Sequence, residues 1–162
     1  MGTPHAAPAF TRLVINSAFT GKGWQGATLT GSIRGLTLKE ALWRPGPGRK
    51  CIWEHVLHCA YWKHAVVRAL TGEEPPAFDR TPSNWPSPPA KPTIRAWRED
   101  IALLKRIHTL LRKAVDRVDP NDYPKLIPNR KNRYGVLIAG IAAHDLYHTG
   151  QIQLIKRLAR AG

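Results

Sequence analysis

The sequence predicts an all-α protein, a bundle of four helices, and three observations support this prediction. Four stretches of the chain repeat apolar residues at intervals of three and four, which is the spacing of an amphipathic helix. Segments rich in proline and glycine separate these stretches, and no stretch alternates apolar and polar residues as a strand does. Helices without a sheet bury their apolar faces against one another, which favours a helical bundle.

The length and composition fit a single domain over residues 1–162. The 162 residues are 43% hydrophobic, which is typical of a globular chain. We expect no membrane helix, since no run of about 18 apolar residues exists, and no signal peptide. Cys51 and Cys59 lie on one predicted helix, about 12 Å apart, which is too far for a disulfide. We therefore expect a cytoplasmic protein whose two cysteines fill small buried positions.

The first predicted helix covers about residues 8–20, and Gly21 and Gly23 follow its end. The next segment, residues 24–50, is predicted to be irregular apart from a short helix around residues 37–43. Alternating proline and glycine close this segment, so a new element is expected to begin after it.

The second predicted helix covers about residues 51–70 and ends at Gly72, which suits a left-handed C-cap. The segment 73–92 contains seven prolines and cannot be a regular element. Antiparallel neighbours need only a short connection, whereas parallel helices need one that crosses the bundle, about 30 Å for a helix of about 20 residues. An extended chain covers that distance, so we expect a long crossover between helices two and three.

The third and fourth predicted helices are the longest. The third covers about residues 93–118, with Thr93 as its N-cap and the cleanest amphipathic pattern of the chain. A loop rich in proline, asparagine and basic residues leads to the fourth helix, about residues 134–159. Basic residues near its end suit a helix C-terminus.

Two histidines of the fourth helix, His144 and His148, carry the strongest functional signal. They are four residues apart, so both rings project from one otherwise apolar face, which Gln151 shares. A buried imidazole needs a polar partner, and one divalent metal ion would serve both rings. A third ligand must come from another helix, and His55 and His58 are the candidates. Three histidines would leave an open position for water or substrate, as in catalytic sites.

Plainer interpretations of these residues exist. A histidine pair at this spacing is often an ordinary core feature rather than a metal site. Helix two also offers a rival ligand set, but its members lie on one helix over about 12 Å and cannot close a tetrahedron. That set is Cys51, His55, His58 and Cys59. Among the other histidines, we expect His108 at the boundary of the core, His64 in solvent and His5 in a loose terminus.

The second and fourth predicted helices resemble those of the DinB/YfiT-like family. The second helix of that family is similar to IWEHVLHCAYWK, residues 52–63, followed by LTG, residues 70–72. Its last helix is similar to IAAHDLYHTGQI, residues 141–152. The WRP and WP segments at residues 43–45 and 85–86 also resemble members of this family. The resemblance extends from about Phe10 to Leu158.

This resemblance implies both a topology and a ligand set. It implies a four-helix bundle with up-down-down-up order, in which helices two and three are parallel. It also implies a divalent metal ion, nickel or zinc, held by His58, His144 and His148, and so it chooses His58 over His55. Some relatives use low-molecular-weight thiols in transfer or isomerisation reactions, where a metal-bound thiolate would be the nucleophile. We therefore expect a small-molecule substrate, with a low-molecular-weight thiol as one candidate. We also expect a homodimer.

Neighbouring side chains narrow the chemistry, although no catalytic residue is assigned. Tyr61 and Gln151 would orient substrate or support the ligands, and ordinary packing is the alternative for both. Asp145 lies about 100° around the helix from His144. A hydrolase with a general base on the ligand face of this helix is therefore not favoured. A metal-dependent transferase that uses a thiol, or a hydrolase of another kind, is the expected enzyme.

The charge of the chain points to anions. There are 25 Lys and Arg residues against 11 Asp and Glu, a formal net charge of +14. Such a charge attracts small anionic cosubstrates as well as phosphates. The basic residues are scattered, however, and no helix-turn-helix, zinc-finger or RNA-recognition motif is present. A nucleic-acid-binding protein linked to DNA damage is thus the less favoured alternative, together with a metal-binding bundle that performs no catalysis.

Overall fold

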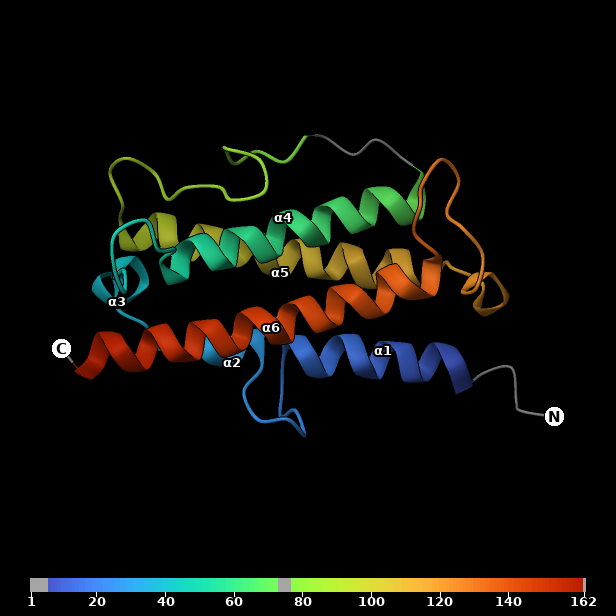
Figure 1. Cartoon of the computed structure of the whole chain (residues 1–162), viewed down its shortest axis with the longest axis horizontal. Helices are drawn as coiled ribbons and strands as arrows, with labels where there is room; N and C mark the ends of the chain where they lie inside the picture. Colours follow the sequence, from blue (N-terminus) through green and yellow to red (C-terminus); the bar gives the residue numbers. More distant parts are fainter. Residues whose placement is uncertain (1–5, 73–76, 162) are drawn as a thin grey trace.

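The computed structural model describes residues 6–72 and 77–161, and across these ranges the chain is helical and forms no strand. Its long helices are α1 (Ala6–Phe19), α4 (Ile52–Thr71), α5 (Ile94–Asp116) and α6 (Tyr134–Ala161) (Figure 1). The shorter elements are α2 (Leu29–Ser32), α3 (Leu38–Leu42) and the 3-10 turn η1 (Pro120–Asp122). The all-α prediction is confirmed, and α2 is an element that the sequence did not indicate.

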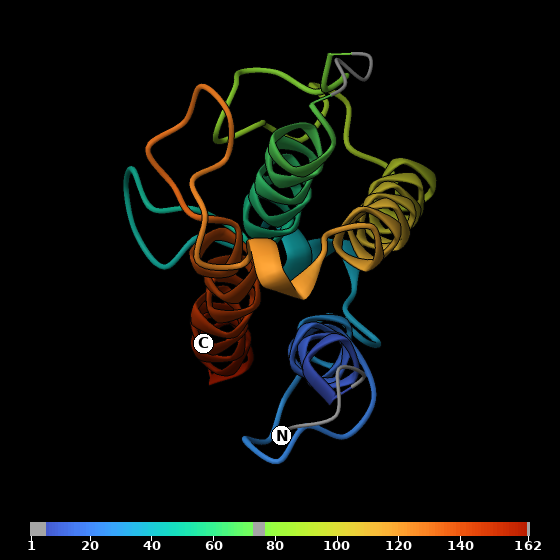
Figure 2. The same ribbon diagram turned by 90° about the vertical axis from the view of Figure 1, so that its right-hand side faces the viewer.

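The long helices surround a common centre in Figure 2, where α4 lies beside α5 and α6, and α1 lies beside α5 and α6. In Figure 1, α4 and α5 both begin at the end of the bundle where α3 lies. Residues 77–93 run along α4 back to that end before α5 begins. This segment therefore passes over the first half of α4, where Asn84 of the segment contacts His58.

The ends of the helices are determined by local chemistry. The hydroxyl of Thr93 accepts a hydrogen bond from the backbone N–H of Ala96, which confirms its role as N-cap of α5. Gly72 ends α4 with a φ of 66°, the left-handed conformation predicted for it. At the start of α4, Glu54 accepts a hydrogen bond of 2.9 Å from the backbone N–H of Cys51. The contacts at Cys51 and Gly72 determine where α4 begins and ends, and so which residues of the segment, His55 and His58 among them, are helical.

The apolar core has two clusters, one around Trp53 and Trp97 and the other around Leu111 and Ile138. Between them along α4, α5 and α6 lie buried polar residues: Lys63, His108, Asp145 and Thr149. Both cysteines are fully buried, as predicted.

The prediction that His108 lies at the boundary of the core is wrong, since only 4% of this residue is exposed. Its ring stacks on Phe19, with centroids 3.6 Å apart. The hydrophobic stripe of α5 continues through this position, so packing takes the imidazole inward despite its polarity. None of the helices described here has the length and apolar character to cross a membrane.

Candidate metal centre

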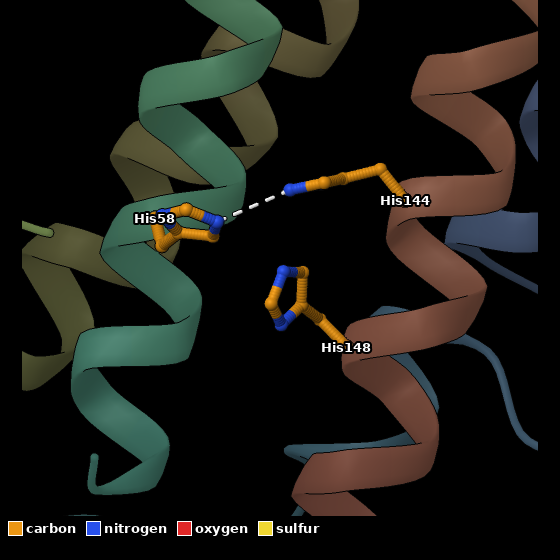
Figure 3. A group of neighbouring side chains, drawn as sticks. All are labelled: His58, His144 and His148. Atoms are coloured by element: carbon orange, nitrogen blue, oxygen red, sulfur yellow. Dashed lines mark hydrogen bonds between the residues drawn. The ribbon is translucent and has the colours of Figure 1, made fainter. Parts of the chain in front are cut away.

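Helices α4 and α6 bring three histidines together near the middle of the bundle. His58 projects from α4, while His144 and His148 project toward it from successive turns of α6 (Figure 3). One ring nitrogen from each residue lies within 4.8 Å of the other two, so the group could hold a metal ion. His58 and His148 are buried and His144 is half-buried.

The spacing of the nitrogens suits one small metal ion. Nε2 of His144 lies 3.2 Å from Nε2 of His58. Two nitrogens bound at about 2.0–2.1 Å in a tetrahedral arrangement would be about 3.3 Å apart. The two rings therefore need little movement to share an ion. They come from different helices, so the packing of α4 against α6 determines this spacing.

The loop before α5 orients His58. Nδ1 of His58 donates a hydrogen bond to the backbone carbonyl of Asn84 at 2.5 Å. A carbonyl only accepts, so the proton resides on Nδ1 and the lone pair of Nε2 faces the other two histidines. Asn84 has a φ of 68°, and its side-chain oxygen accepts from the indole N–H of Trp62 at 2.9 Å. The next residue, Trp85, stacks on the His58 ring at 3.8 Å.

Two side chains, those of His55 and Gln151, contact one ring nitrogen of His148. Its Nδ1 lies 2.9 Å from Oε1 of Gln151 and 3.0 Å from Nδ1 of His55. A proton on this Nδ1 satisfies both neighbours as acceptors and leaves Nε2 of His148 available for a ligand bond. The predicted supporting role of Gln151 thus has a direct contact behind it. His55 takes a place beside the three-histidine group rather than within it.

Burial keeps these imidazoles neutral, which is the form that binds metal. Removal from water lowers the pKa of His144 to about 3 and the pKa of His148 to about 4, with repulsion among the rings as a further cause. The pKa of His58 is also lowered by burial, although its bond to Asn84 acts in the opposite direction. The pKa of His55 falls to about 3 for the same reason.

A second group of possible ligands lies next to the first. Atoms of Cys59, His144 and Asp145 also lie within 4.8 Å of one another. Here Lys63 donates a hydrogen bond to Asp145, and both side chains are 1% exposed. The ammonium group already provides the positive charge that this carboxylate needs. Burial also raises the pKa of the Cys59 thiol well above its ordinary value, which disfavours the thiolate. This group is therefore the weaker metal site.

The other residues singled out in the sequence lie elsewhere. The ring of Tyr61 packs edge-on against Phe78, with centroids 5.7 Å apart, so its contacts favour ordinary packing. His64 is half-buried, and its ring lies 5.7 Å from the Phe78 ring, so it is less solvated than predicted. His5 lies outside the described residues. The contacts of Asn84 and Trp85 with His58 were not predicted, because a proline-rich loop carries no periodic signal.

A cavity of about 440 Å³ lies beside the cluster, and His55, His148 and Gln151 form part of its wall. A bound ion would therefore be close to a space that accepts a small molecule.

The chain is an all-helical protein with three histidines that could hold a metal ion where α4 contacts α6. The family model of the DinB superfamily matches residues 24–152, and the chain belongs to this superfamily. Comparisons with curated proteins and with solved structures give no match.

Proposed function

We propose that this chain is a metal-dependent enzyme in which His58, His144 and His148 hold one divalent ion. The observation that supports the proposal is the convergence of three ring nitrogens within 4.8 Å of one another, two of them from buried histidines. A neutral set of three imidazoles suits zinc or nickel, and it leaves a position free for substrate. Metal binding is also a property of the superfamily to which the chain belongs.

The ion would supply Lewis acidity and would favour the thiolate form of a bound thiol. The chain's own residues do the positioning. Asn84 and Trp85 hold the His58 ring, and Gln151 and His55 hold His148. The buried imidazoles stay unprotonated near neutral pH. We propose thiol-dependent transfer or isomerisation as the reaction class, with a low-molecular-weight thiol as cosubstrate.

Elemental analysis of protein purified without an affinity tag tests the metal site. We expect about one equivalent of zinc or nickel in the wild type and a large loss in His58→Ala. A matched control is His64→Ala, which changes a histidine of the same helix outside the cluster. If the wild type binds no divalent ion, or His58→Ala binds as much as His64→Ala, the assignment is wrong.

A thiol screen separates an enzyme from a metal-binding bundle without turnover. Metal-loaded wild type and His58→Ala would be compared for consumption of free thiol in the presence of electrophilic acceptors. Turnover that depends on His58 supports the enzyme. Metal binding without turnover of any thiol in the screen favours the non-catalytic bundle.

Further parts of the proposal concern organisation. We propose the up-down-down-up helix order of the superfamily, and the common starting end of α4 and α5 supports it. A single domain over residues 1–162, a cytoplasmic location and a homodimer complete the proposal. Duplex DNA is the less favoured partner. If the protein does not bind duplex DNA at low salt, this alternative is wrong.

A further inference from the structure

The cavity beside the cluster has walls of mixed character. One wall is formed by His55, His148 and Gln151, which belong to or support the candidate metal centre. The lining also includes residues of the chain before α4, among them Arg49 and Lys50. Its volume of about 440 Å³ lies within the range of about 300–1,000 Å³ that small-molecule sites occupy.

Positive charge around this cavity exceeds negative charge. No carboxylate side chain is among the residues that line it. Nearby, Glu54 accepts from both Arg44, at 2.6 Å, and Lys50, at 3.0 Å, so one carboxylate offsets two cations. Arg49 is exposed and pairs with no carboxylate of residues 6–72 or 77–161. Its guanidinium group is therefore available to a ligand.

The histidine side of the cavity adds no negative charge either. The side chains there are imidazoles and an amide, and neither kind of group carries a negative charge. A divalent ion held there by neutral ligands would keep its full charge and would also favour an anion in the neighbouring space.

Two large and exposed side chains, one aromatic and one aliphatic, also line the cavity. Tyr147 and Leu154 line it and are 64% and 59% exposed, a large exposure for such side chains. They are seven residues apart on α6 and so lie on one face of the helix. A ligand with an apolar or aromatic body would cover both side chains.

We propose that this cavity binds a small carboxylate with an apolar body, that Arg49 pairs with the carboxylate, and that Tyr147 and Leu154 contact the body. This inference rests on the proposed function in that it names the substrate class of the same site. The pairing with Arg49 does not require a bound metal ion. A guanidinium group binds a carboxylate through two parallel hydrogen bonds, which gives Arg49 a clear advantage over Lys50 in this role.

Calorimetric titration with phenylacetate, and with the uncharged phenylacetamide as its matched control, tests the proposal on metal-free and zinc-loaded protein. The variant is Arg49→Gln. The control variant is Arg98→Gln, which removes an exposed arginine of α5 that does not line the cavity. We expect the amide to bind at least about tenfold more weakly than the carboxylate, and Arg49→Gln to weaken phenylacetate binding about tenfold. Arg98→Gln should change it less than about twofold.

Three results would overturn the inference: no phenylacetate binding by the wild type, equal binding of acid and amide, or equal effects of Arg49→Gln and Arg98→Gln. Zinc uptake, measured separately by equilibrium dialysis, keeps the two proposals apart. Carboxylate binding that depends on Arg49 in a protein that takes up no zinc would support this site and refute the metal centre. Zinc binding that depends on His58, with carboxylate binding indifferent to Arg49, would refute only the carboxylate site.

Discussion

The imidazole of His58 lies nearly parallel to the indole of Trp85, with ring planes 12° apart and centroids separated by 3.8 Å. The same loop also holds the edge of the His58 ring, because the Asn84 carbonyl accepts a hydrogen bond from Nδ1 of His58. One ligand of the candidate centre is thus oriented by a segment outside the long helices. The stacked pair can be tested directly.

We expect Trp85→Ala to weaken zinc affinity by about 10–100-fold, the usual cost of losing a group that orients a metal ligand. Trp85→Phe retains a flat ring and should lose less. Competition with a chromophoric chelator measures the affinity. Trp24→Ala serves as a matched control, since Trp24 is fully exposed. Equal affinities for Trp85→Ala and Trp24→Ala would show that the stacked ring does not hold His58.

Metal binding should persist into mild acid. An imidazole with an ordinary pKa near 6.5 loses about 1.5 log units of availability between neutral pH and pH 5, or about four orders of magnitude for three ligands. Burial lowers the pKa of His144 to about 3 and of His148 to about 4, so both stay neutral at pH 5. We expect zinc affinity in equilibrium dialysis at pH 5 to remain within about tenfold of its value at pH 7. A fall of about four orders of magnitude in protein that is still folded would contradict the lowered pKa values.

The buried ion pair of Lys63 and Asp145 should be costly to break. Lys63→Met leaves a carboxylate unpaired in the core, and we expect a loss of about 3–5 kcal/mol in the free energy of unfolding. The double variant Lys63→Met with Asp145→Leu should recover much of this loss. Urea denaturation of metal-free protein at pH 7 measures both. Lys125→Met breaks an exposed pair with Asp122 and should change the free energy of unfolding far less, because solvent screens exposed charges. Similar costs for the two single lysine variants would mean that the core pair is better hydrated than its burial indicates.

His108 should make the protein sensitive to acid. Neither of its ring nitrogens has a hydrogen-bond partner within the described parts of the chain, and burial lowers its pKa from 6.5 to about 3. The unfolded chain therefore binds a proton near pH 6.5 that the folded chain does not. The contribution of neutral His108 to the free energy of unfolding is therefore fully present above pH 6.5, and it declines as the pH falls toward 3.

The variant His108→Leu should accordingly gain stability relative to wild type by about 2 kcal/mol more at pH 5 than at pH 8. Urea denaturation of metal-free protein at the two pH values gives this difference. An identical pH dependence in the wild type and in His108→Leu would exclude His108 as its source.

Local patterns in the sequence predicted most of the helices, because periodicity and capping act within a few residues. Gly72 and Thr93 end and begin helices where expected, and the spacing of His144 and His148 places both rings on one face. The contact of His58 with Asn84 spans 26 residues through a proline-rich loop and depends on how that loop lies along α4. The pairing of Lys63 with Asp145 was equally hidden, since charged residues of a helix normally face water.

His58 and His144 are 86 residues apart in the chain, although their Nε2 atoms are 3.2 Å apart in the fold. An ion shared by these rings would act as a reversible crosslink between α4 and α6 that only the folded chain can form. Each tenfold rise in free metal above the dissociation constant would then add about 1.4 kcal/mol to the free energy of unfolding. The supply of metal in the surroundings would in this way govern how long each molecule survives proteolysis, as well as whether its site is loaded.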